Sequence, residues 1–201
     1  MDDIDRIREF IKIQRKYASF FEWYKREKSI KEVGVVETLL TSLSVDGYAS
    51  YQNIRASAFD PPDVLAETMH GALVGFELRE LVDQEAIELN ERGKEVYRDW
   101  TTSEVIQELQ KIIQEKDTKK YIGGPYEKLI LVIPTAEPVL THWQLKPVLD
   151  TYEFNQTNQL QEAYLLFQYD PAIKSYPYIK LRLSANTRLD PTGNKPVAGL
   201  H

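Results

Sequence analysis

The chain has no cysteine, which excludes disulfides and thiolate zinc sites. It also has no apolar run approaching the roughly 20 residues that a membrane-spanning helix needs. Its histidines, His70, His142 and His201, are scattered and form no recognisable metal-binding motif. The amino terminus has aspartates where a secretory signal carries positive residues. These absences predict a cytoplasmic protein with no membrane partner.

What is present agrees with a compact protein. The chain has 201 residues, of which 42% are apolar and 28% charged, so one domain with extensions is expected. The net charge is −6, but residues 1–31 hold nine basic and six acidic side chains, whereas residues 60–100 hold four and eleven. The basic end suits contact with phosphates. A solvated helix face of mixed charge is the simpler interpretation of the same residues.

Two acidic residues are placed to meet across a predicted β-hairpin. The hairpin joins residues 63–67 to residues 72–79 through a turn that ends in glycine. A turn centred on His70 puts Asp63 opposite Glu77, with Cβ atoms about 5 Å apart. Facing carboxylates repel each other, and a hard divalent cation such as Mg2+ or Mn2+ would offset the repulsion. The hairpin therefore predicts a metal site.

The two faces of this hairpin differ in polarity. By the period-2 rule one face is apolar and predicts a core surface, formed by Val64, Ala66, Val74, Phe76 and Leu78. The carboxylate face also carries Arg79 and Gly75. Because Gly75 has no side chain, it predicts room for a substrate backbone to come close.

Pro62-Asp63 and Glu77-Leu78-Arg79 together resemble the signature of the PD-(D/E)XK nuclease superfamily, which includes restriction endonucleases, Holliday-junction resolvases and repair nucleases. In that family the acids hold a metal ion, and a lysine orients or deprotonates the attacking water. The resemblance implies that Asp63 and Glu77 are catalytic metal ligands and that Arg79 stands at the lysine position. Arginine stabilises developing negative charge but cannot release a proton near neutral pH. The alternative is an ordinary exposed hairpin that binds nothing.

The same resemblance implies a third acid on the helix before the first core strand. In a helix over residues 29–43, Glu32 lies close to the apolar stripe and Glu37 lies well off it. Glu32 is therefore the expected third metal ligand. A capping box between Ser29 and Glu32 is the alternative. Gln84, at the start of a later helix, is a candidate for orienting substrate or water, with a surface role as its alternative.

Hydrophobic periodicity predicts the remaining elements. Helices are expected over residues 3–28 and 141–152. A further helix is expected to begin at Gln84, after an Asp83 cap, and to have Gly93 in its middle. Another is expected to follow a capping box at residues 101–104. Strands are expected over residues 48–58, 129–133, 163–169 and 178–183, the last an edge strand. The resemblance covers about residues 29–170. The order indicates an α/β protein whose restriction endonuclease-like core has a mixed central β-sheet flanked by helices.

This core is expected over residues 29–184, after an extra N-terminal helix within residues 1–28 and before an irregular tail, 185–201. The leading hypothesis is a metal-dependent nuclease that hydrolyses phosphodiester bonds in DNA. The second is a catalytically inactive nuclease-fold module that binds nucleic acid or protein. The third is a partner-binding protein that forms a homodimer through the N-terminal helix, with the carboxylates serving local structure.

Overall fold

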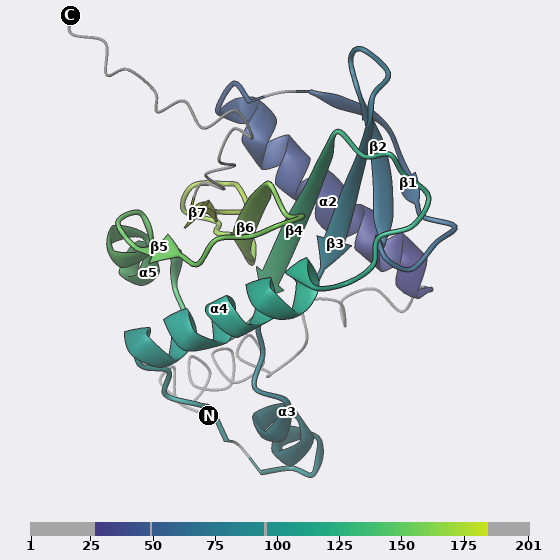
Figure 1. Ribbon diagram of the computed structural model, residues 1–201. Coiled ribbons are helices and arrows are strands. Elements are labelled where there is room, and N and C mark those ends of the chain that lie inside the picture. The colour runs from purple at the N-terminus through teal and green to yellow at the C-terminus, as the bar shows by residue number, and fades with distance from the viewer. Residues whose placement is uncertain (1–26, 49, 95, 185–201) are drawn as a thin grey trace, which may run out of the picture.

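The computed structural model describes residues 27–48, 50–94 and 96–184. These residues form an α/β structure built on one seven-stranded mixed sheet (Figure 1). The helices are α2 (Lys28–Val45), α3 (Gln84–Glu91), α4 (Thr102–Asp117) and α5 (His142–Leu149). The strands are β1 (Tyr51–Ala56), β2 (Val64–Thr68), β3 (Leu73–Leu78), β4 (Lys128–Thr135), β5 (Glu153–Phe154), β6 (Glu162–Phe167) and β7 (Tyr178–Leu183). None of the helices in these ranges is long and apolar enough to cross a membrane.

The sheet has the order β1-β2-β3-β4-β6-β7-β5. Strands β1, β2 and β3 form an antiparallel meander. Strand β4 then runs parallel to β3, and β6 runs parallel to β4. Strand β7 pairs antiparallel with β6 and carries the two-residue strand β5 on its outer side. The meander thus lies on one side of the central strand β4, and β6 and β7 lie on the other.

Helices cover both faces of the sheet, with α2 on one face and α4 on the other (Figure 1). The apolar face of the β2–β3 hairpin packs against the buried side of α2, as its alternation predicted. On the opposite face, α4 and α5 cover β4, β6 and β7. Strand β4 is buried from Leu129 to Thr135, which confirms that it is covered on both sides.

Local sequence signals explain several of these elements. The Asp63-to-Leu78 hairpin turns at Gly71, whose φ of 81° is readily adopted only by glycine. The pairs Val64–Phe76 and Leu65–Gly75 confirm the predicted register. Helix α3 begins after Asp83, which accepts a hydrogen bond from the Ala86 amide. Helix α4 begins with the predicted capping box, formed by Thr101 and Glu104.

Some local predictions were wrong. Helix α2 begins after Glu27 with no side-chain cap, so Ser29 does not form a capping box. Gly93, expected inside a helix, follows the end of α3 with a φ of 77°, which is typical of a helix stop. Strand β7 has the expected bounds but is followed in the sheet order by β5, which was not predicted. The N-terminal helix over 3–28 and the tail 185–201 fall almost entirely outside the described residues.

Candidate functional site

The hairpin brings Asp63 and Glu77 together beside helix α4. Asp63 lies directly before β2, where its amide donates to the Phe76 carbonyl at 3.0 Å. Its Oδ2 accepts a hydrogen bond from the Leu78 amide at 2.7 Å, which fixes the carboxylate across the hairpin. Burial, followed by the charge of Glu77, raises the pKa of Asp63 to about 6. The charge of Glu77 is therefore close enough to disfavour ionisation of Asp63.

Glu77 is fully buried at the centre of this cluster. Its Oε1 accepts hydrogen bonds from Lys116 Nζ at 2.5 Å and from Lys119 Nζ at 3.0 Å. Its Oε2 has no hydrogen-bond partner among the described residues. A buried carboxylate oxygen without a partner lowers the free energy of unfolding, because its desolvation is not offset. A cation bound to Glu77 Oε2 would offset it.

Both lysines come from the carboxyl-terminal end of α4 and the loop after it. Burial lowers the pKa of Lys116 and outweighs the opposing effect of Glu77. Burial also acts to lower the pKa of Lys119. The hydrogen bond and the electrostatic attraction between Lys119 and Glu77 outweigh burial, so the pKa of Lys119 is raised. The neighbouring side chain of Asp117 accepts backbone hydrogen bonds from the loop at residues 158–160. That contact holds the end of α4 against the body of the protein.

Glu32 approaches the cluster from the buried face of α2. It pairs with Lys28 at 3.3 Å, and its charge contributes to the raised pKa of Asp63. Glu37 is exposed, in agreement with the helical periodicity. The structure thus brings Glu32 near Asp63, while its direct contact is with a lysine.

Two expected site residues lie apart from these contacts. Arg79 is exposed just beyond β3, and no ion pair or hydrogen bond joins its guanidinium to the described residues, Asp63 and Glu77 included. Gln84 is exposed at the first turn of α3 and makes no side-chain hydrogen bond within the described ranges. The space expected at Gly75 is also filled, because a Cβ there would lie 2.8 Å from Leu129 Cδ2 and 3.1 Å from Pro62 Cγ. The room that the sequence predicted at Gly75 for a substrate backbone is therefore taken by these two side chains.

The cluster carries an excess of negative charge that suits a divalent cation. Four carboxylates and three ammonium groups interact with one another in it: Glu32, Asp60, Asp63, Glu77, Lys28, Lys116 and Lys119. Within residues 27–48, 50–94 and 96–184, no three His, Cys, Asp or Glu side chains are arranged as a complete set of metal ligands. The buried Glu77 Oε2, which has no hydrogen-bond partner among these residues, is the atom of the cluster at which a cation would fit, with its remaining ligands from water or phosphate, as Mg2+ commonly has.

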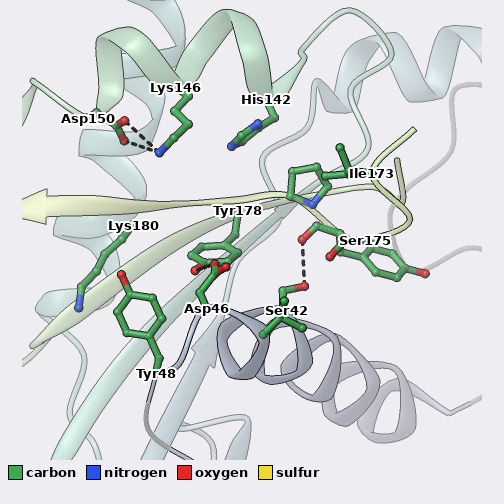
Figure 2. A pocket seen from close by; sticks show the side chains of 13 residues that line it. Ser42, Asp46, Tyr48, His142, Lys146, Asp150, Ile173, Ser175, Tyr178 and Lys180 are labelled. Carbon is green, nitrogen blue, oxygen red and sulfur yellow. Dashed lines mark hydrogen bonds and ion pairs between the residues drawn. The ribbon is translucent and has the colours of Figure 1, made fainter. Parts of the chain in front are cut away.

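A separate cavity of about 570 Å³ lies between the end of α2, helix α5 and strand β7 (Figure 2). Its charged side chains are paired within the protein. Lys146 binds Asp150 at 2.9 Å, Lys180 binds a glutamate of β6 at 3.2 Å, and the Tyr178 hydroxyl donates to Asp46. This cavity therefore lacks the unmatched charge that distinguishes the carboxylate cluster, which is the stronger candidate site.

No protein-family model, curated protein or solved structure matches this chain. The candidate site therefore rests on its own geometry.

The sequence interpretation missed Lys116 and Lys119. One signal was available for Lys116, because it lies four residues after Ile112 and seven after Leu109, on the buried stripe of α4. A lysine on an apolar stripe needs a buried anion or an exit to solvent. The sequence offered no means of choosing Glu77 as that anion, since the two residues are 39 positions apart.

Proposed function

We propose that this chain is a metal-dependent nuclease that hydrolyses phosphodiester bonds in DNA. The observation that carries the proposal is the meeting of Asp63 with Glu77, whose Oε2 is buried without a partner among the described residues. The order of elements supports a restriction endonuclease-like core. A helix precedes three antiparallel strands, and a second long helix leads to a strand parallel to the third.

Each charged residue of the cluster has a distinct proposed role. Asp63 and Glu77 are the ligands of Mg2+ or Mn2+, and Glu32, which pairs with Lys28, adds negative charge beside them. When bound, such an ion lowers the pKa of water and stabilises negative charge on phosphate oxygens. Lys116 and Lys119 place positive charge beside the same carboxylates, where it offsets the charge of a phosphate. In this proposal the lysine pair takes the role that the resemblance gave to Arg79.

One observation favours the alternative, an inactive module that binds nucleic acid or protein. Glu77 Oε1 is already paired with two ammonium groups, which compete with a metal ion for that oxygen. In such a module the lysines would neutralise Glu77 permanently, and the hairpin would serve only the fold.

Cleavage of supercoiled plasmid and of single-stranded DNA with Mn2+ distinguishes the two functions. We expect wild type to cleave, Glu77→Gln to be inactive, and Lys116→Gln to lose about 100-fold in rate, as for removal of one group that stabilises the transition state. Arg79→Ala should retain most activity, since the structure places Arg79 outside the cluster. Glu67→Gln, an acid on the same hairpin paired with Arg55, is the matched control.

Two outcomes would contradict the nuclease proposal. Cleavage that persists in Glu77→Gln would come from a contaminant, and absence of cleavage by folded wild type would favour the binding module. Circular dichroism of each variant establishes that a loss of activity does not come from unfolding.

A further inference from the structure

Two loops beside the carboxylate cluster are joined to each other. The Ile122 amide donates to the Pro61 carbonyl at 3.4 Å. The ring of Phe59 lies against Gly123, where a Cβ would come within 2.4 Å of Phe59 Cδ2. Only glycine leaves room for this ring, and the φ of 87° at Gly123 also favours glycine. Residues 57–63 and 119–126 thus contact each other and are here called the paired loops.

The paired loops contact the cluster through charged and aromatic residues. Asp60, next to Phe59, interacts electrostatically with both Lys119 and Lys28. The Tyr121 hydroxyl donates to the Lys116 carbonyl at 3.0 Å. Burial, followed by the charge of Glu77, raises the pKa of Tyr121. Phe59 therefore adjoins Asp60, which interacts electrostatically with Lys119, and Lys119 in turn donates a hydrogen bond to Glu77.

Phe59 and Ile122 leave apolar surface in solvent at this position. Phe59 is 46% exposed and Ile122 is 42% exposed. The side chain of Lys28 is 79% exposed and that of Lys119 is 37% exposed, so cations that can reach phosphates lie beside the same surface. An aromatic ring among cations is the arrangement with which proteins bind single-stranded nucleic acid, because bases stack on the ring while the cations follow the backbone.

We propose that Phe59 stacks on an unpaired base next to the phosphate that a cation on Asp63 and Glu77 would hold, so that the substrate is single-stranded DNA or an unpaired DNA end. This inference rests on the proposed nuclease function. In a duplex each base face is already covered by its neighbours, so Phe59 has a stacking partner only where the strand is unpaired.

The test measures binding by fluorescence anisotropy, with Ca2+ in place of Mn2+ as the oxygen-binding cation. The probes are a labelled oligothymidylate of about 12 nucleotides, within the usual site size, and a hairpin duplex of similar length. Phe59→Leu keeps apolar bulk against Gly123 but removes the stacking face, whereas Phe59→Trp keeps it. Tyr169→Leu, a comparably exposed aromatic residue in another loop at 49%, is the matched control.

We expect wild type to prefer the single strand and Phe59→Leu to weaken that binding about tenfold, the loss of one stacked base. Phe59→Trp should restore it, and Tyr169→Leu should bind like wild type. Unchanged single-strand binding in Phe59→Leu, or an equal loss for the duplex, would overturn the inference.

Cleavage by the same proteins separates this inference from the proposed function. If wild type cleaves DNA but Phe59→Leu binds and cleaves single strands normally, the stacking inference fails and the nuclease assignment stands. If wild type cleaves nothing yet binds single strands through Phe59, the nuclease assignment fails and the stacking role is retained by a binding module.

Discussion

At Glu77 a carboxylate is fully removed from water, with one oxygen paired twice and the other without a partner among the described residues. Such an arrangement destabilises the folded state, because the burial of a charge is fully offset only when every lone pair is satisfied. Asp63 adds a second acid whose pKa is already raised. A raised carboxyl pKa such as that of Asp63 occurs both at functional sites and in structural ion-pair networks.

The raised pKa of Asp63 predicts a pH-dependent stability. Its pKa is about 6 in the folded protein and 3.8 when free, so between these values the folded state holds more protons than the unfolded state. The contribution of Asp63 to stability is therefore complete at low pH and is lost as the pH rises through about 6. Asp63→Asn still accepts the Leu78 hydrogen bond but does not titrate. As the pH rises, its free energy of unfolding should therefore increase relative to that of wild type, by about 1–2 kcal/mol after discounting partial exposure.

Urea unfolding in EDTA between about pH 4 and about pH 7 measures this difference. The quantity that matters is the free energy of unfolding of the variant minus that of wild type. A difference that stays constant over this range would show that Asp63 titrates normally.

Among the elements, α4 has the largest influence on the site. Its first turn is closed by the capping box, and Arg98 pairs with Glu104 there and with Asp83 at the start of α3. Its last turn places Lys116 on Glu77. The cap and these ion pairs hold the start of α4 in place, and its other end brings Lys116 to Glu77, 39 residues earlier in the chain.

Loss of the cap should weaken α4 measurably. Thr101→Ala removes the acceptor for the Glu104 amide and should lower the free energy of unfolding by about 1 kcal/mol. Thr101→Ser keeps the hydroxyl and should remain close to wild type. Urea denaturation of both variants at neutral pH measures the effect, and equal losses in the two would assign it to packing of the threonine methyl group.

On the scale of the whole molecule, the site joins segments that are distant in sequence. The residue before β2, the end of β3 and the end of α4 meet at one point, with the start of α2 beside them. A cation held there would bind only the folded chain, so it would stabilise the entire structure by mass action.

We therefore expect Mn2+ to raise the melting temperature of wild type. At about 100 times the dissociation constant the gain is about 2.7 kcal/mol, which corresponds to a rise of several degrees for a protein of this size. The double variant Asp63→Asn, Glu77→Gln should show no such rise, whereas Glu67→Gln should respond like wild type. Scanning calorimetry with and without Mn2+ provides the comparison, and equal rises in all three proteins would place the ion elsewhere.

The sequence by itself determined the features that depend on short-range geometry. The register of the β2–β3 hairpin, its apolar face and the capping box of α4 follow from turn length, strand alternation and the spacing of two residues. The placement of Asp63 near Glu77 is also a short-range feature, since a tight turn brings the two strands of the hairpin together wherever the hairpin packs. The α/β class follows from the succession of such elements.

Only the tertiary structure decided which cations meet the carboxylates and what fills the space around them. Lys116 reaches Glu77 because the apolar stripe of α4 packs on that face of the sheet. This packing fixes the orientation of the helix about its own axis, and so the direction in which Lys116 points. Arg79 lies past the last residue of β3, where it is exposed. Leu129 closes the space at Gly75 because β4 lies beside β3. These contacts join residues far apart in the chain, and their geometry depends on the packing of the whole core.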